Sequence, residues 1–152
     1  TSRLCDYRLL PYATADYLQQ AAPIRKAEDL EQHRWISYID DLLFTNQQVT
    51  LQQWFPDVKP FFSSTSVIAQ FHAARAGVGL AFLPCFMASA APELVPVLAD
   101  DIDVTRTFWL VTHKDKRELS RVKALWDYLR QAADSNRDYL LGTSDTMQWL
   151  NH

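Results

Sequence analysis

The stretch between residues 63 and 84 constrains the fold of this chain most strongly. It opens with four consecutive hydroxyl side chains at residues 63–66, and an amphipathic pattern follows over residues 65–76. Gly77-Val78-Gly79 ends that pattern, and the apolar run 79–83 stops at Pro84. Hydroxyls favour a helix start, glycine favours its end, and a short apolar run between Gly and Pro favours a buried strand. We therefore predict a capped helix, a tight turn and a buried strand, with polar groups gathered at the helix start.

The composition favours one ordinary domain or two small lobes. The chain has 152 residues, of which 48% are hydrophobic, which is enough for a packed core. The formal net charge is -3 and the basic residues are scattered singly, so the chain by itself is not expected to hold nucleic acid.

Cys5 and Cys85 are far apart in the sequence, and we expect reduced thiols. No apolar run reaches the roughly 20 residues that span a bilayer, and no secretory signal is seen at the N-terminus. The chain begins with Thr1, so we expect it to be a piece of a longer protein.

The remaining elements alternate between strands and helices, which predicts an α/β fold. Pro11 predicts that the first strand lies at a sheet edge or ends there. Thr14 is an N-cap candidate for the helix that follows it. The expected strands cover 6–13, 34–39 (half-buried), 61–63, 79–83, 94–98 and 105–113, and the expected helical segments cover 15–21, 27–32, 65–76, 85–90 and 118–131. We expect a loop with one turn over 42–60, and a loosely held tail after residue 134 with two apolar anchors, at 139–141 and 147–150.

The polar motifs carry no catalytic or metal-binding signature. The four His residues are separated by tens of residues, no Ser or Cys lies in a nucleophile motif, and Gly77-Val78-Gly79 follows a helix instead of opening one. We therefore expect no enzyme activity, no metal and no cofactor. For Ser64, Thr65 and Ser66 two interpretations stay open: one hydroxyl caps the helix and the others face water, or together they bind a carboxylate at the helix N-terminus.

Three segments, taken together, resemble the effector-binding domain of LysR-type transcriptional regulators. Residues 10–18, Leu-Pro-Tyr-Ala-Thr-Ala-Asp-Tyr-Leu, are similar to the family's entry into the second lobe. Residues 28–33, Glu-Asp-Leu-Glu-Gln-His, are similar to its "x-D-L-x-x-H" motif before a strand. Residues 76–84, Ala-Gly-Val-Gly-Leu-Ala-Phe-Leu-Pro, are similar to its "a-G-x-G-i-a-x-L-P" motif.

The resemblance implies a fold and a function. The fold is a type 2 periplasmic-binding-protein-like lobe with a truncated part of the first lobe. Its expected divisions are a crossover strand at 1–12, the second effector-binding lobe at 13–103, a return strand and helix at 104–133, and the C-terminal tail at 134–152. Such domains bind a small organic acid, amino acid or aromatic metabolite between the lobes and so control a DNA-binding domain that this chain lacks. By the same resemblance, Thr14, Thr65 and Ser66 match polar positions of the cleft, with Ser64 as a further candidate.

The resemblance also implies a cytoplasmic, homo-oligomeric bacterial regulator that contacts DNA only through the missing N-terminal domain and does not bind a membrane. A solute-binding receptor domain of a transport system is the alternative, and an enzyme on an α/β scaffold is a third class. The apolar faces of helix 118–131 and of the strand with Phe108 and Trp109 need a cover. We expect them to fold back locally or to pair with another copy of the chain.

Overall fold

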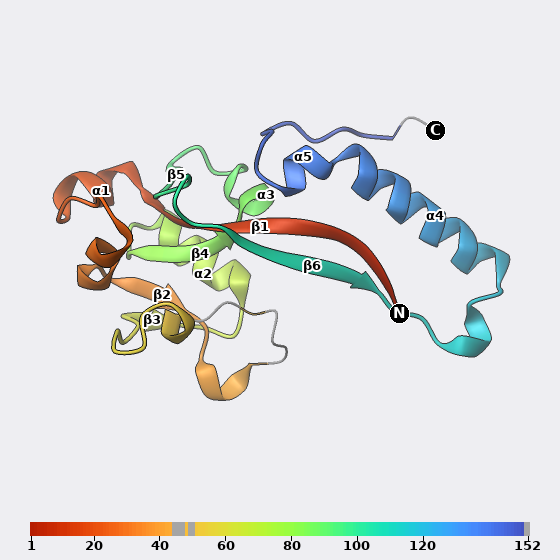
Figure 1. Ribbon diagram of the computed structural model, residues 1–152, viewed down its shortest axis with the longest axis horizontal. Coiled ribbons are helices and arrows are strands. Elements are labelled where there is room, and N and C mark those ends of the chain that lie inside the picture. Colours follow the sequence, from red (N-terminus) through yellow and green to blue (C-terminus); the bar gives the residue numbers. More distant parts are fainter. Residues whose placement is uncertain (44–47, 49–50, 151–152) are drawn as a thin grey trace.

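The computed structural model describes residues 1–43, 48 and 51–150 of the chain (Figure 1). The elements in these ranges are, in chain order, β1 (Ser2–Thr14), α1 (Ala15–Gln20), η1 (Ala27–Gln32), β2 (Trp35–Ser37), η2 (Asp40–Leu42), η3 (Leu51–Gln53), β3 (Phe62–Ser63), α2 (Val67–Arg75), β4 (Leu80–Pro84), α3 (Cys85–Ala88), β5 (Leu94–Pro96), β6 (Val104–Leu110), η4 (Lys114–Lys116), α4 (Ser120–Ser135) and α5 (Arg137–Leu140). The α/β prediction is confirmed. The loop expected over 42–60 lies partly outside the described residues, and η3 forms the expected turn within them.

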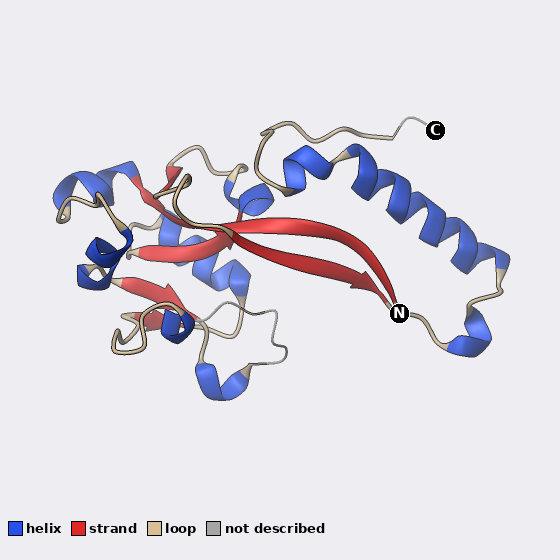
Figure 2. Cartoon of the chain, in the orientation of Figure 1, coloured by secondary structure: helices blue, strands red, loops and turns tan. Residues whose placement is uncertain are grey.

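One mixed sheet organises the chain. Its strand order is β3-β2-β4-β1-β5, and β6 also pairs with β1. β2 is parallel to both β3 and β4, whereas β1 is antiparallel to β4, β5 and β6. The pairing of β1 with β4 ends at Leu9↔Pro84, and residues 2–8 of β1 continue beyond it, paired only with β6. Figure 2 shows this pair of strands as a long ribbon that runs from the sheet to the N-terminus. The ribbon therefore leaves the sheet at the carboxyl-terminal edge of β2 and β4.

The prediction that Pro11 marks an edge or a strand end is wrong. β1 runs through Pro11 to Thr14 and has partners on both sides. On one side of β1 the partner strand changes near Pro11. Pairing with β6 ends at Leu9↔Val104, and pairing with β5 begins at Tyr12↔Pro96. The Pro11 nitrogen, which carries no hydrogen, faces the gap between these two partners. The Pro11 carbonyl on that side accepts a hydrogen bond of 2.9 Å from the Val97 N-H. Proline is tolerated here because no ladder hydrogen bond requires its missing donor.

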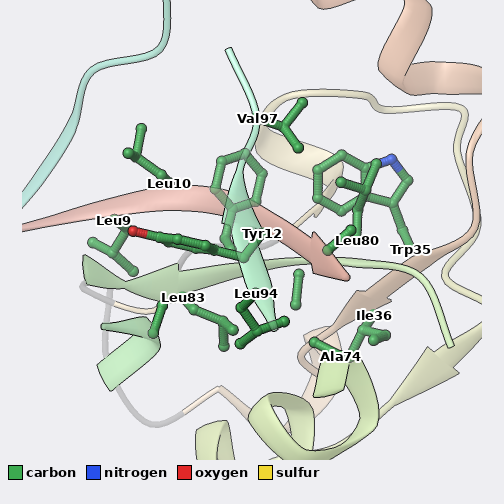
Figure 3. Close-up of a cluster of buried hydrophobic side chains, with 14 of the residues drawn as sticks. Leu9, Leu10, Tyr12, Trp35, Ile36, Ala74, Leu80, Leu83, Leu94 and Val97 are labelled. Carbon is green, nitrogen blue, oxygen red and sulfur yellow. The ribbon is translucent and has the colours of Figure 1, made fainter. Parts of the chain in front are cut away.

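β2 is buried on both faces, which corrects the half-buried strand expected at 34–39. Trp35, Ile36 and Ser37 are all buried, because β2 lies between β3 and β4 and both of its faces are covered. The Trp35 ring stacks on Phe82 of β4, with 5.2 Å between the ring centroids. Ile36 lies next to Ala74 of α2 on the other side of the strand (Figure 3). The core thus extends across both sides of the short parallel strands.

Helix α2 begins and ends close to the predicted residues but buries a different face. The amphipathic pattern of residues 65–76 puts Ile68 on the apolar face, but 59% of its surface is exposed. Gln70, a polar residue, is 1% exposed instead, and its Nε2 donates a hydrogen bond of 3.0 Å to the Ser64 carbonyl. This hydrogen bond replaces the hydrogen bonds to water that the amide loses on burial, so a buried Gln70 is tolerated. The core face of α2 is therefore centred on Gln70 and Ala74.

The two glycines after α2 act in different ways. Gly77 has φ +77°, the left-handed conformation that commonly ends a helix. At Gly79, a Cβ atom would lie 2.2 Å from the Arg34 carbonyl oxygen of the neighbouring strand segment. The predicted tight turn is confirmed at Gly77, whereas Gly79 allows close approach to the backbone of Arg34, just before β2.

The chain after β6 lies against the ribbon. Helices α4 and α5 both contact β1, and α5 also contacts α3. α4 continues to Ser135, beyond the predicted end at 131, and α5 follows where the sequence predicts a loose tail. The Tyr139 hydroxyl donates a hydrogen bond of 2.9 Å to the Phe86 carbonyl of α3, so the first apolar anchor is attached. Trp149, in the second, remains 79% exposed.

A buried histidine links α1 to β2. The Tyr17 hydroxyl accepts a hydrogen bond of 3.1 Å from the Arg34 N-H and forms another, also of 3.1 Å, with His33 Nδ1. With the hydroxyl as the donor to Nδ1, His33 is neutral. Burial lowers the pKa of His33, and the Ala22 carbonyl and the Asp29 charge offset only part of that effect.

We expect the stability of the chain to fall in mild acid because of His33. Its pKa is lowered in the folded chain, so below the unfolded value of about 6.5 the unfolded chain binds more protons. The free energy of unfolding should therefore fall as pH drops from about 7 to about 5. Urea unfolding at a series of pH values measures this slope. His33→Asn should reduce it, whereas His72→Asn, at an exposed position, should leave it unchanged. An equal slope in wild type and His33→Asn contradicts the prediction.

Candidate ligand site

The predicted hydroxyl cluster lies at the N-terminus of α2. Ser66 is the N-cap, and its Oγ accepts a hydrogen bond of 3.4 Å from the Ala69 N-H. The Ser64 Oγ accepts one of 3.1 Å from the Ser66 N-H. Thr65 is exposed, and its hydroxyl makes no hydrogen bond to any residue that the structure describes. Ser64 and Ser66 thus have local structural roles, and the Thr65 hydroxyl is available.

Two residues that are not among the predicted site residues, Ser37 and Gln70, hold this cluster in place. The Ser37 carbonyl, at the end of β2, accepts a hydrogen bond of 3.0 Å from the Ser64 N-H, and Gln70 binds the Ser64 carbonyl from α2. Ser37 Oγ also accepts a hydrogen bond of 3.1 Å from the Leu51 N-H. The signal for Gln70 was available in the sequence: it lies one helical turn before Ala74, on the face that turns inward.

The cluster lies at the carboxyl-terminal edge of the parallel strands. Ser37 ends β2, Ser63 ends β3, and the chain then enters α2. In open α/β sheets this edge is where ligands bind. A helix N-terminus there adds unpaired N-H groups and a partial positive charge, both of which attract carboxylates. Burial raises the pKa of Tyr38, which directly follows β2, so its hydroxyl stays protonated.

Thr14 lies at the opposite edge of the sheet. It ends β1 beside Leu94 and caps α1, where its Oγ1 accepts a hydrogen bond of 3.2 Å from the Tyr17 N-H. A Cβ atom placed on Gly77 would be 3.7 Å from the Thr14 Oγ1. Thr14 is therefore close to the C-terminal end of α2, while the three other candidates are at its N-terminal end, about 14 Å away along nine residues. The structure groups Ser64, Thr65 and Ser66 and separates them from Thr14.

Other kinds of site find no support among the described residues. No group of three or more His, Cys, Asp and Glu side chains there could hold a metal ion. Cys5 and Cys85 are free thiols, as expected. None of the helices in the described ranges is long and apolar enough to cross a bilayer.

The chain is similar to regulatory domains of known structure. The regulatory domain of CrgA, a LysR-type transcriptional regulator from Neisseria meningitidis, is 23% identical with a TM-score of 0.67, over 86% of this chain and 67% of that chain. Full-length AphB, a virulence activator of Vibrio cholerae, is 23% identical with a TM-score of 0.65, over 85% of this chain and 46% of that one. The effector domain of the regulator AmpR from Pseudomonas aeruginosa is 21% identical with a TM-score of 0.63, over 85% and 62%. A search of curated proteins gave no match.

These likenesses concern the fold, and the chain spans less than half of the full-length regulator AphB. They confirm the expected type 2 periplasmic-binding-protein-like architecture. The model of one protein family, the LysR substrate binding domain, matches residues 1–134. Because this match covers most of the chain and agrees with the fold and with the three sequence segments, the chain belongs to the LysR substrate binding domain family.

Proposed function

We propose that this chain is the effector-sensing part of a LysR-type transcription regulator. It binds a small metabolite at the N-terminus of α2 and thereby controls a DNA-binding domain that lies outside the chain. The single observation that carries this proposal is the position of the Thr65 hydroxyl and the α2 N-terminus at the carboxyl edge of β2 and β3. The family match favours this regulator over a transport-type solute receptor.

The ribbon formed by residues 2–8 of β1 and by β6 offers a route by which ligand binding can control the DNA-binding domain. Residues 2–8 of β1 and their partner β6 leave the sheet at the same edge as the ligand site. A ligand that contacts both the α2 N-terminus and the ribbon would favour one angle between the ribbon and the lobe that contains α2. It would thereby shift the equilibrium between two arrangements of the lobes. We therefore propose the division expected from the sequence: 13–103 is the effector-binding lobe, while 1–12 and 104–133 belong to the first lobe.

We also propose that the working protein is a cytoplasmic homo-oligomer without catalytic activity. Folding back of the chain covers the apolar faces of β6 and α4 only in part, since four large apolar side chains remain exposed: Phe108, Trp109, Val111 and Leu125. A surface of this kind is typical of an interface. Association with a second copy would cover it, and sedimentation of the full-length regulator measures that association.

Substituting Thr65 tests the ligand site. In the full-length regulator, Thr65→Val should weaken binding of its effector by about 1–3 kcal/mol, because a carboxylate oxygen loses its hydroxyl donor. The effector is first found by a thermal-shift screen of small carboxylic and aromatic metabolites, and its affinity is then measured by calorimetry. Thr143→Val, at an exposed position after α5, is the control and should bind normally. Unchanged affinity in Thr65→Val removes Thr65 from the site.

A further inference from the structure

A second pocket lies at the other edge of the sheet, around Thr14. It has a volume of about 370 Å³, at the small end of the range for ligand pockets. It is formed by α1, the residue before β2 and the C-terminal end of α2, and its lining residues are Thr14, Ala15, Asp16, Tyr17, Gln20, Arg34, Arg75, Ala76, Gly77 and Glu93. The length of α2 separates this pocket from the proposed effector site.

Arg34 brings an uncompensated positive charge to this pocket. Its guanidinium lies over the rings of Tyr17 and Phe61, 5.3 Å from each centroid, and donates a long hydrogen bond of 3.5 Å to the Gly77 carbonyl. No carboxylate among the described residues forms an ion pair with it. Arg75, in the same pocket, differs because it is paired with Glu93. The two rings therefore hold Arg34 in position while its charge stays available for an anion.

Thr14 supplies a fixed hydroxyl donor. Its side chain is 8% exposed, and its Oγ1 accepts the Tyr17 N-H. The hydroxyl proton has no acceptor among the residues that the structure describes. A hydroxyl whose proton is unused, beside a free guanidinium, is a suitable pair of donors for a carboxylate.

Asp16 adds the opposite charge. Asp16 is one of the residues that line the same pocket, and its carboxylate forms no ion pair in the described part of the chain. A simple anion that approached Arg34 would be repelled by Asp16, whereas a ligand that carries an ammonium group beside its carboxylate would satisfy both charges. Tyr17, Ala15 and Ala76, which also line the pocket, are residues that can offer apolar contact to a ligand side chain.

From this arrangement we infer that the pocket is a binding site for a free α-amino acid. Arg34 and the Thr14 hydroxyl bind the carboxylate, and Asp16 binds the ammonium group. The site is separate from the proposed effector site, and it does not depend on the proposed function of Thr65.

Matched ligands test this inference on the chain itself. Calorimetric titration with L-leucine, L-glutamine and L-phenylalanine should show binding of at least one of them. Its deaminated acid and its decarboxylated amine, for example 3-phenylpropionate and phenethylamine for L-phenylalanine, should each bind at least tenfold more weakly. Inorganic phosphate should not compete. If no amino acid binds, or if the acid alone binds equally well, the inference is overturned.

Paired variants assign the contacts. Arg34→Gln and Asp16→Asn should each weaken amino acid binding at least tenfold, while Arg25→Gln and Asp57→Asn, at exposed positions outside the pocket, should not change it. Thr65→Val should also leave it unchanged, which distinguishes this site from the effector site. Thermal unfolding checks that each variant folds, and Asp16→Asn keeps the test decisive if Arg34→Gln does not fold. Binding that is insensitive to both pocket variants contradicts the assignment.

Discussion

Replacing Gly79 by alanine is expected to lower the free energy of unfolding by about 3 kcal/mol or more. The new Cβ would lie 2.2 Å from the Arg34 carbonyl oxygen and 2.8 Å from its carbonyl carbon, and backbone atoms cannot move aside as a flexible side chain can. The Arg34 carbonyl also accepts a hydrogen bond of 2.9 Å from the Leu80 N-H, which holds the entry to β4. The substitution therefore combines overpacking with loss of a buried hydrogen bond.

Gly77→Ala provides the matched control, because it adds the same methyl group two residues earlier. Its Cβ would meet only the Thr14 Oγ1, at 3.7 Å, which is an ordinary contact. Its cost comes from the left-handed backbone alone and should be about 1–2 kcal/mol. Urea unfolding followed by tryptophan fluorescence measures both variants. Equal losses in the two would show that the contact with Arg34 is not the cause.

Replacing Trp35 by alanine should cost about 3–5 kcal/mol, a large part of the stability of an ordinary domain. Trp35 is fully buried, and its ring packs against Phe82 and Phe55. Its Nε1 donates a hydrogen bond of 2.8 Å to the Leu30 carbonyl, which would lose its partner. The loss of apolar contact and the unpaired carbonyl act in the same direction.

Two further variants separate these contributions. Trp35→Phe keeps an aromatic ring in the core but removes the donor to Leu30, so it should cost less than alanine while remaining destabilising. Trp149→Ala, at an exposed position, should change stability by less than about 0.5 kcal/mol. Circular dichroism during urea unfolding provides the measurement, since it does not depend on the tryptophan removed. A small effect of Trp35→Ala contradicts the prediction.

Elements that depend on nearby residues could be predicted from the sequence. The Thr14 cap and the end of α2 at Gly77 result from contacts within a few residues, and both are observed. The buried strand at Leu80–Pro84 is also observed, and its short apolar run between Gly79 and Pro84 marks it in the sequence. The family resemblance rests on the same short segments, and the match over residues 1–134 agrees with it. Local capping and backbone preferences act in any tertiary context, which is why these predictions were reliable.

Features that depend on partners elsewhere in the chain are mispredicted or left open by the sequence. Pro11 lies inside the sheet only because β5 and β6 divide one side of β1 between them. Gln70 replaces Ile68 in the core because the Ser64 carbonyl offers an acceptor. Tyr139 is attached because α3 presents the Phe86 carbonyl, which lies 53 residues away in the sequence. The strand pairing of Pro11 and the α3 carbonyl beside Tyr139 cannot be identified from the residues around these positions, whereas Gln70 shares a helix face with Ala74 and has its acceptor at Ser64.

The candidate ligand residues show the same division. From the residues and their spacing it follows that hydroxyls gather at the start of a helix, that a glycine turn follows, and that the chain resembles a family of sensors. Only the folded chain shows that Ser64 and Ser66 are used in local hydrogen bonds, that Thr65 remains available, and that Thr14 belongs to another pocket with Arg34 and Asp16. This is because residue types and their spacing define caps and turns, whereas the order and direction of the strands define which edge of the sheet each side chain reaches.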